Sequence, residues 1–312
     1  MFHGSRQLRR LMLKIKANFF SNATSIQGFA LVDVISSIGS SKQKAYFHAS
    51  QNKKKMPLVV HLHEWTFGYE IFPVRSELGI LCKKAGFNYI FPDFCGSNNT
   101  PESCASEKAI VDIDNAIDFA IEKGNVDADN IVIVGQSGGG HAALAMYMKS
   151  RHRIKYFSVW CPISDIERWY YQTKNAGLRY CKDIEKVVEG SQNIAEMKNR
   201  SPLYMDFGEG VDRKDAKLEL YHGINDGYSG SVLCLHSFWF YNKINEDSIS
   251  CPEILNVVSR SIPNNSTEFI GDRKLLYEKK NGNVCLSIFD GTHEILMEYA
   301  FGHIKSLTTA GE

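Results

Sequence analysis

Apolar residues follow two different periods along this chain. Short, almost continuous apolar runs alternate with longer segments in which apolar residues recur every three or four positions; these patterns are typical of buried strands and of amphipathic helices. Strands are predicted at residues 28–36, 42–50, 57–63, 88–94, 130–136, 156–162, 217–223 and 283–290. Helices are predicted at residues 75–86, 106–124, 138–150 and 294–307.

The order of these elements predicts the fold class. Because strands and helices alternate, we expect an α/β fold with a mostly parallel sheet covered by helices on both faces and connected in the right-handed sense. The first two strands flank a Gly/Ser turn and predict an N-terminal hairpin. From about 165 to 215 the chain is polar, rich in tyrosine and interrupted by glycine and proline, which indicates a helical excursion over the sheet. The expected organisation is a single domain over residues 25–312.

A basic segment precedes this domain at residues 1–24. It contains RQLRRLMLKIKANFF, in which Lys14 and Lys16 interrupt the apolar run that a signal peptide requires. No stretch of the chain is long and apolar enough for a transmembrane helix. We expect a surface helix or an ordered extension of the domain, with a helix lying on a membrane surface as the alternative.

Composition narrows the range of partners and compartments. The net charge of +1 argues against nucleic acid or an anionic membrane as the main partner. Eight cysteines form neither a CxxC pair nor a cluster with histidine, so we expect reduced thiols, a cytoplasmic protein and no metal site. The chain has no GxGxxG spacing, and GQSGGG lacks the lysine of a phosphate loop, so no nucleotide cofactor is expected.

The stretch IVIVGQSGGGHAALA, residues 131–145, places a serine between glycines where a strand becomes a helix. Gly135 to Gly139 fit the pattern G-x-S-x-G, which in this context predicts a nucleophile elbow at Ser137. Such a turn strains the backbone and leaves no room for neighbouring side chains. It also directs the Gly138 N–H, at the start of the helix, toward a developing oxyanion. The alternative is a turn in which small residues serve packing alone.

A serine nucleophile needs a base, and the base needs an orienting carboxylate. In this fold the order along the chain is serine, acid, histidine, with each residue after a strand. Asp226 follows strand 217–223 and His293 follows strand 283–290, so we predict them as acid and base. The rival bases, expected to be structural, are His141, His222, His236 and His303, and the rival acids are Asp165, Asp272 and Asp290.

The loop after strand 57–63 should supply a second oxyanion donor. It reads His63-Glu64-Trp65 and lacks the HGG glycines common at this point. The donor is a backbone N–H of Glu64 or Trp65, or the imidazole of His63; the sequence leaves the three open. Candidate substrate contacts are Trp65, Tyr69 and Trp169, although aromatic residues in such positions equally often serve as core or pocket wall.

Taken together, these segments resemble the α/β-hydrolase superfamily and, within it, the catalytic domain of the prolyl oligopeptidase family. The resemblance rests on PLVVHLHEW, GQSGGGHAAL, HGINDG and FDGTHEI and extends over roughly residues 35–305. It implies Ser137 as nucleophile, Asp226 as acid, His293 as base and the Gly138 N–H as oxyanion donor. Two features depart from the peptidases of this family: no β-propeller precedes the domain, and His63 stands near the place of their oxyanion tyrosine.

The sequence thus predicts a serine hydrolase that works through an acyl-enzyme. We favour a carboxylic ester as substrate, because neither a propeller nor a pair of acids for binding a peptide amine is visible. The aromatic residues Trp160, Trp169, Tyr170 and Tyr171, together with Trp65, are suited to stack on a sugar ring or an aryl acyl group, which fits an acylated carbohydrate. A peptidase acting on short peptides and a non-catalytic binding scaffold are the alternatives. The expected partner is a small molecule; the oligomeric state is not predicted.

Overall fold

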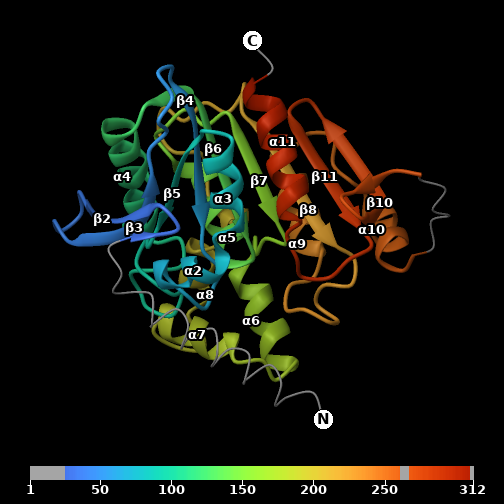
Figure 1. The fold of residues 1–312 in the computed structure, drawn as a ribbon. Coiled ribbons are helices and arrows are strands. Elements are labelled where there is room, and N and C mark those ends of the chain that lie inside the picture. Colours follow the sequence, from blue (N-terminus) through green and yellow to red (C-terminus); the bar gives the residue numbers. More distant parts are fainter. Residues whose placement is uncertain (1–24, 261–266, 310–312) are drawn as a thin grey trace.

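Eleven strands form one sheet in the part of the chain that the computed structural model describes, residues 25–260 and 267–309 (Figure 1). Their spatial order is β1-β2-β3-β5-β4-β6-β7-β8-β11-β10-β9. The strands are β1 Ser25–Ile26, β2 Phe29–Ile35, β3 Lys42–His48, β4 Met56–Leu62, β5 Asn88–Pro92, β6 Val126–Gln136, β7 Tyr156–Trp160, β8 Lys217–Gly223, β9 Phe269–Ile270, β10 Arg273–Asn281 and β11 Val284–Phe289.

The middle of the sheet is parallel and its two margins are antiparallel. Neighbours from β5 through β4, β6, β7 and β8 to β11 run in the same direction. The predicted opening hairpin, β2 and β3, joins one margin, and β10 with β9 forms the other. The predicted mostly parallel α/β sheet is therefore confirmed. Both β9 and β10 were missed, because β9 is very short and β10 is a charged edge strand that carries no continuous apolar run.

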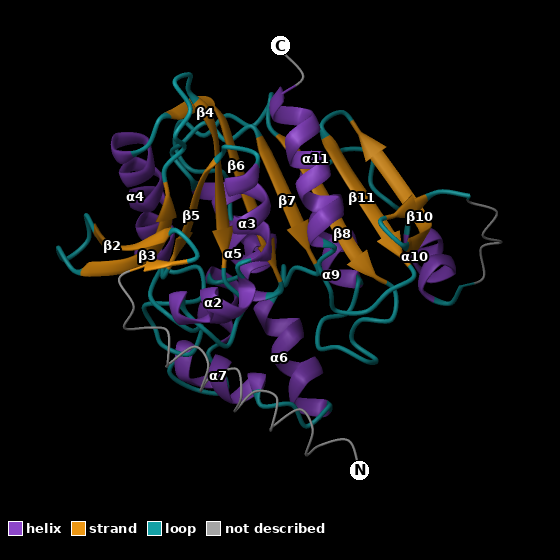
Figure 2. Ribbon diagram, in the orientation of Figure 1, coloured by secondary structure: helices purple, strands orange, loops and turns teal. Residues whose placement is uncertain are grey.

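Helices cover both faces of the sheet (Figure 2). They are η1 Tyr69–Ile71, α2 Phe72–Arg75, α3 Glu77–Lys84, α4 Glu107–Lys123, α5 Gly138–Lys149, α6 Ile166–Asn175, α7 Tyr180–Val187, α8 Ile194–Asn199, η2 Pro202–Tyr204, α9 Leu235–Ile244, α10 Cys251–Val258 and α11 Met297–Thr309. Helices α3 and α11 pack on one face; α4, α5 and α9 pack on the other. The final helix begins three residues later than predicted, and the preceding loop carries His293.

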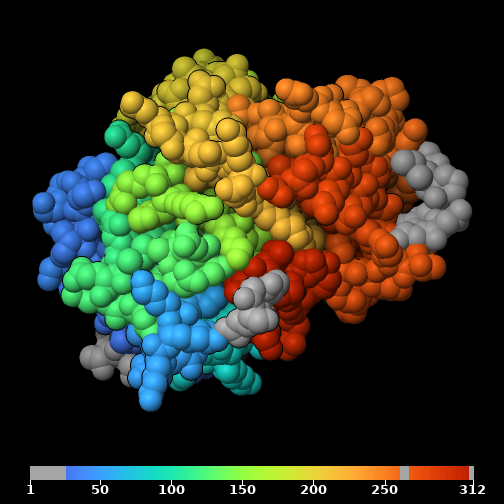
Figure 3. Space-filling view, turned by 90° about the horizontal axis from the view of Figure 1, so that it is seen from above, coloured from blue at the N-terminus to red at the C-terminus, as the bar shows by residue number. Residues whose placement is uncertain are grey.

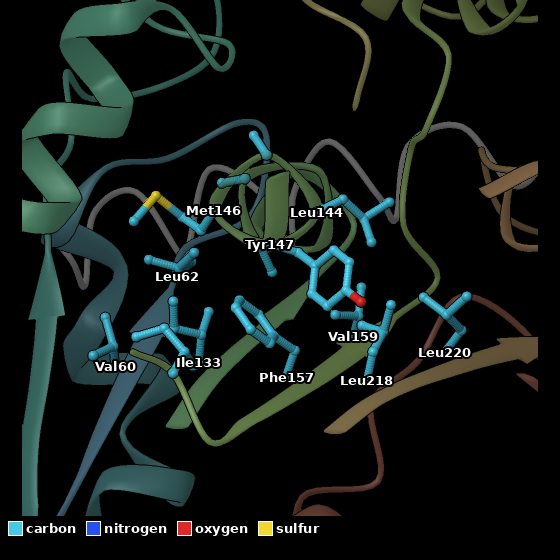
Figure 4. Packing of buried hydrophobic residues seen from close by; sticks show 14 of the residues in the cluster. Val60, Leu62, Ile133, Leu144, Met146, Tyr147, Phe157, Val159, Leu218 and Leu220 are labelled. Carbon is cyan, nitrogen blue, oxygen red and sulfur yellow. The ribbon is translucent and has the colours of Figure 1, made fainter. Parts of the chain in front are cut away.

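Helix α5 is buried along almost its whole length. Every residue from Gly138 to Met148 is buried, as expected for a helix that is apolar all round. Figure 4 shows Leu144 and Tyr147 of this helix above Phe157 and Val159 of β7. The N-terminus of α5 is consequently fixed against the ends of β4, β6 and β7, and this N-terminus is where Ser137 lies.

The segment between β7 and β8 forms the predicted helical excursion. Its helices α6, α7 and α8 lie beyond the carboxyl ends of the strands (Figure 1) and enclose a small apolar cluster of their own. Trp65, from the loop after β4, belongs to this cluster together with Ile166, Trp169 and Ile184. The excursion is therefore packed directly onto the loops at the catalytic edge of the sheet.

Across the sheet the strands follow their order in the chain, except that β4 and β5 exchange places and β9, β10 and β11 come in reverse order. Seen from above, the colours pass from blue at one side through green to orange and red at the other (Figure 3). The eight cysteines are free thiols. Within the described ranges, no helix is both long and apolar enough to cross a bilayer. The basic segment 1–24, predicted as a surface helix, lies outside the described residues.

A buried carboxylate, Glu219, links β8 to its neighbours. It accepts hydrogen bonds from the hydroxyls of Tyr156, at 2.5 Å, and Tyr221, and it pairs with Lys217 at 2.6 Å. His303 of α11 lies 3.4 Å from the same carboxylate. Burial opposes the negative charge, but the hydrogen bonds from these partners outweigh it and lower the pKa of Glu219 to about 2.

Protonation of Glu219 is expected to destabilise the fold in acid. Because its folded pKa lies below the ordinary value of 4.5, the contribution is complete above about pH 4.5 and is lost as the pH falls toward 2. The pKa shift corresponds to a contribution on the order of 3 kcal/mol to the free energy of unfolding. Urea unfolding should show that Glu219→Gln loses less of its unfolding free energy between pH 7 and pH 3 than the wild type does. An equal loss in both proteins would contradict the assignment.

Candidate active site

Ser137 occupies a strained turn between β6 and α5. Its φ of 59° and ψ of −118° lie in a region that side chains rarely adopt. The Ser137 N–H donates to the Trp160 carbonyl at 2.9 Å, and the Ser137 carbonyl accepts from the His141 N–H at 2.9 Å. Because the adjacent strand and helix hold both backbone groups, the hydroxyl is presented at the carboxyl edge of the sheet. Ser137 is 8% exposed.

Gly138 brings the nucleophile's turn against the loop after β4. A Cβ at this position would overlap the backbone nitrogen and Cα of Trp65, so only glycine allows this approach. Within the described residues, neither the Gly138 N–H nor the Trp65 N–H has a hydrogen-bond acceptor. Two unpaired backbone N–H donors therefore lie beside Ser137. Such a pair of donors can stabilise an oxyanion.

The side chain of His63 is engaged elsewhere. Its Nε2 lies 2.8 Å from the Asp93 carbonyl and its Nδ1 lies 3.1 Å from the Glu64 carbonyl, while the ring stacks on Phe94 at 3.8 Å. Both nitrogens are therefore occupied, and the imidazole does not fit the oxyanion donor that the sequence left open. Of the three alternatives, the amide of Trp65 is the one that the structure places against Gly138.

Asp226 lies in the loop after β8, fully buried, with N–H groups around both carboxylate oxygens. Its Oδ1 accepts from the backbone of Gly227, Ser231 and Val232 at 2.8–3.1 Å. Its Oδ2 lies 2.5 Å from His293 Nδ1. A second histidine, on β8, contacts the same Oδ2 at 3.2 Å.

These contacts keep the carboxylate charged. Burial alone would raise the pKa of Asp226, but hydrogen bonds from His222 and His293 outweigh this effect and hold the pKa well below its ordinary range. Asp226 is therefore an anion near neutral pH. An anion in this position can orient an imidazole and stabilise it once it is protonated.

His293 lies between the acid and the nucleophile's turn. Because its Nδ1 faces a carboxylate, Nδ1 carries the hydrogen and Nε2 remains free to accept a proton. The side-chain amide of Gln136 donates to the His293 carbonyl at 3.1 Å and thus ties the base to the residue before Ser137. The Ser137 hydroxyl makes no hydrogen bond to any described residue, a common state for a nucleophile without substrate.

Two residues that hold this arrangement were not singled out in the sequence. Gln136 is one, although its place directly before the nucleophile was a usable signal. Gly230 is the other: a Cβ there would overlap the Asp226 carboxylate and lie 2.8 Å from the Cβ of His293. Nothing in the local sequence distinguishes Gly230 from an ordinary turn glycine.

The expected aromatic substrate contacts have other roles. Trp169 is fully buried, donates its indole N–H to the Ser231 carbonyl at 2.7 Å and packs edge-on against Trp65 at 4.7 Å. Tyr69 is half-buried and packs against Tyr46. Direct substrate contact by Trp169 is therefore wrong, because no face of the ring is accessible.

The suggestion of an acylated carbohydrate loses its basis for the same reason. Of the aromatic residues behind it, Trp160, Trp169 and Tyr170 are buried, and only Tyr171 is exposed, at 46%. Buried rings cannot stack on a sugar. Trp65, also 2% exposed, contributes its backbone rather than its ring to the surface near Ser137.

The rival acids and bases hold structural positions. His141 lies 2.9 Å from the Ile163 carbonyl, and His236 accepts from the backbone N–H groups of Ser164 and Asp165. The side chain of Asp165 caps α6. His236 is the second residue of α9. Among the rivals, only His222 contacts Asp226.

One buried group could be taken for a metal site. Ligand atoms of Cys161, His222 and Asp226 lie within 4.8 Å of one another. However, His222 Nε2 lies 3.2 Å from both Asp226 Oδ2 and the Val232 carbonyl, so it carries a hydrogen and offers no lone pair. Burial also raises the pKa of the Cys161 thiol well above its ordinary range. The donor set fits a hydrogen-bonded cluster and not a cation site.

Comparison with known proteins decides the family. The sequence profile of the prolyl oligopeptidase family matches residues 74–245, more than half of the chain. The chain belongs to the prolyl oligopeptidase family. The match includes Ser137 and Asp226 and ends before His293.

Solved structures show the same fold at low sequence identity. An acylaminoacyl peptidase of Pyrococcus horikoshii aligns with a TM-score of 0.54 and 14% identity, over 94% of this chain and 42% of the peptidase. An esterase of Pyrococcus furiosus aligns at 0.53 and 13%, over 89% and 90% of the two chains. Esterase B from Lactobacillus rhamnosis aligns at 0.52 and 15%, over 77% of each. No curated protein sequence matches the chain.

These alignments differ in extent. The chain spans about two fifths of the length of the acylaminoacyl peptidases and nine tenths of the Pyrococcus furiosus esterase. At such identities the likeness concerns the fold alone. What this member of the prolyl oligopeptidase family hydrolyses must therefore be inferred from its own site.

Proposed function

We propose that this member of the prolyl oligopeptidase family hydrolyses carboxylic esters through an acyl-enzyme, with Ser137 as nucleophile, His293 as base and Asp226 as its orienting acid. The observation that carries the proposal is the 2.5 Å contact between His293 Nδ1 and a buried, ionised Asp226 on a loop that Gln136 ties to the serine turn. This arrangement supplies each group that acyl transfer needs.

Acylation begins when Ser137 Oγ attacks the ester carbonyl carbon and its proton passes to His293 Nε2. The carbonyl oxygen becomes negative and is stabilised by the N–H groups of Gly138 and Trp65. The imidazolium is stabilised by Asp226. The carbon–oxygen bond to the alcohol then breaks, and the departing alkoxide takes the proton from His293.

Deacylation repeats these steps with water. His293 Nε2 takes a proton from water as the water oxygen attacks the acyl carbon, and the same two N–H groups stabilise the oxyanion. The bond to Ser137 Oγ breaks, and Oγ recovers the proton from His293. A carboxylic acid leaves, and the enzyme returns to its resting state.

The charges around the site support an ester over a peptide amine. The carboxylates adjacent in sequence to the site residues are already paired: Glu64 with Arg75 at 2.8 Å, and Glu294 with Arg273 at 3.0 Å. Asp226 faces two histidines. Among these described groups, no carboxylate remains to bind the ammonium of a peptide, whereas a neutral ester needs none. The near-complete alignment with an esterase agrees with this choice.

Hydrolysis of short peptides is the second candidate. It is favoured by the family itself and by the structural likeness to acylaminoacyl peptidases. The same Ser137 and His293 would act, but protonation of an amide leaving group by His293 would contribute more to the rate, since an amine leaves less readily than an alkoxide.

A substrate panel separates the two. We expect p-nitrophenyl esters of short acyl chains to be hydrolysed with a kcat/KM at least about 100-fold above that of aminoacyl- and N-acylaminoacyl-arylamides, a difference of roughly 3 kcal/mol in transition-state binding. Activity toward the esters should fall in acid, because an imidazolium cannot act as the base. Efficient arylamide turnover with negligible ester hydrolysis would reverse the assignment, and a rate independent of pH between about 5 and 8 would remove His293 as the base.

A further inference from the structure

A second histidine lies on the far side of the candidate acid. His222 is the penultimate residue of β8 and is fully buried. Its Nε2 lies 3.2 Å from Asp226 Oδ2, the same oxygen that His293 contacts, and 3.2 Å from the Val232 carbonyl. Its Nδ1 lies 2.7 Å from the hydroxyl of Ser237 on α9. The steps proposed above use neither His222 nor Ser237.

The partners fix where the hydrogen on His222 lies. Both groups that face Nε2 are acceptors, a carboxylate and a carbonyl, so Nε2 carries a hydrogen in either protonation state of the ring. In the neutral ring Nδ1 is then an acceptor, and the Ser237 hydroxyl donates to it. The acceptors at Nε2 therefore select the tautomer that presents an N–H to Asp226, and the Ser237 hydroxyl holds the ring in place by donating to Nδ1.

We propose that His222, held by Ser237, is a positioning residue that shares Asp226 Oδ2 with His293 and thereby limits how strongly the carboxylate attracts the proton of the base. The inference rests on the proposed function of Ser137, His293 and Asp226. It assigns to a histidine expected to be structural a part in setting the pH range of catalysis.

The physical reason is competition for one oxygen. Each N–H that points at Oδ2 withdraws part of its negative charge, and the remaining charge is what stabilises the His293 imidazolium. Without the His222 donor, Oδ2 would attract the His293 proton more strongly. The imidazolium form of His293 would then persist to higher pH, where it cannot accept the proton of Ser137. The loss would also remove one restraint on the orientation of the carboxylate.

The other titratable groups around this cluster do not change charge near neutrality. Burial lowers the pKa of His236 to about 3 and raises the pKa of the Cys234 thiol to about 12. Burial also raises the pKa of Cys161 well above its ordinary range. Glu294 is paired with Arg273, and its pKa is lowered by that pairing. A change in the pH profile between 5 and 9 is therefore not caused by these neighbouring groups.

The test uses the rate of Ser137 modification by a fluorophosphonate, which requires no knowledge of the acyl substrate, measured from pH 5 to pH 9. In His222→Leu, which removes the N–H, we expect the acid limb of the profile to move to higher pH by about one unit and the plateau to fall about tenfold, the size of effect expected from one hydrogen bond to a charged group. His222→Gln, which can restore an N–H to Oδ2, should return the limb toward its wild-type position.

Two further variants keep the test decisive. Ser237→Ala removes the hydroxyl that holds the His222 ring against Asp226. It should move the acid limb in the same direction by a smaller amount, which provides a test even if His222→Leu fails to fold. His61→Leu is the matched control, because His61 is also a buried histidine but bonds to Tyr89 and not to Asp226. It should lower the melting temperature and leave the limb in place.

The outcomes are distinct. An unmodified wild type would refute the proposed function itself. The positioning role alone would be overturned if the wild type is modified with a sigmoidal pH profile but the His222 and Ser237 variants lose only stability or plateau rate. In that case the acid limb of the profile stays at the same pH in all proteins, and the proposed function remains intact. Equal movement of the limb in His61→Leu would also overturn the positioning role.

Discussion

Ser137→Ala is expected to lose ester hydrolysis on the order of 10⁴-fold or more, and His293→Ala to lose about as much, because members of such a triad act as a unit. The hydroxyl supplies the atom that forms the acyl bond. The His293 imidazole contacts Asp226, and the His293 backbone carbonyl accepts from Gln136, the residue before Ser137. The double variant should be hardly worse than either single one. The measurement is kcat/KM for the best aryl ester of the panel.

Two controls accompany these variants. Labelling by a fluorophosphonate should disappear in Ser137→Ala, while the melting temperature remains close to that of the wild type, since the substitution removes only a hydroxyl without a hydrogen bond to the described residues and keeps the same backbone. A Ser137→Ala variant that retains more than about a hundredth of wild-type activity would exclude this serine as the nucleophile.

Asp226→Asn is expected to reduce kcat by about 10⁴-fold even though the side chain keeps its size. Around the described carboxylate, all five partners within hydrogen-bond distance are N–H donors, three on Oδ1 and two on Oδ2. An asparagine must direct its NH₂ group at one of these sets, where it meets donors and finds no acceptor. If the NH₂ faces the histidines, the tautomer of His293 is reversed and Nε2 carries the hydrogen.

Asp290→Asn is the matched control for this prediction. Asp290 directly follows β11, three residues before the base; its exposed side chain accepts from the half-buried Asn225 at 3.2 Å. The substitution should change kcat by no more than about threefold, as expected for an exposed polar contact. If kcat falls equally in the two variants, Asp226 cannot be singled out as the acid of the triad.

The sequence predicted the parts of the fold that bury continuous apolar surface. Strands such as β4 and β7 are buried at each position and were visible as uninterrupted apolar runs. Strand β10 was not, because Arg273, Glu278 and three lysines leave it no such run. The break of the predicted helix at Ser76 depends on packing of the short α2 turn, which no local signal specifies.

The candidate site could be predicted as far as chain order determines it. Ser137, Asp226 and His293 each follow a parallel strand, so their common edge was foreseeable, and the structure brings the last two into contact. Contacts between side chains from distant segments were not foreseeable. The bond from Gln136 to His293, the place of His222 on Asp226 and the burial of Trp169 all depend on three-dimensional packing that residue type alone does not reveal.

The indole of Trp169 and the acid loop meet at a single carbonyl, that of Ser231, whose own N–H donates to Asp226. The helices beyond the carboxyl ends of the strands are therefore connected by hydrogen bonds to the loop that carries Asp226. Grafting a different or shorter cap onto this scaffold would leave that carbonyl without its donor and loosen the loop around the carboxylate. A change of specificity by exchange of the cap would consequently alter turnover as well, unless the replacement supplies an equivalent anchor.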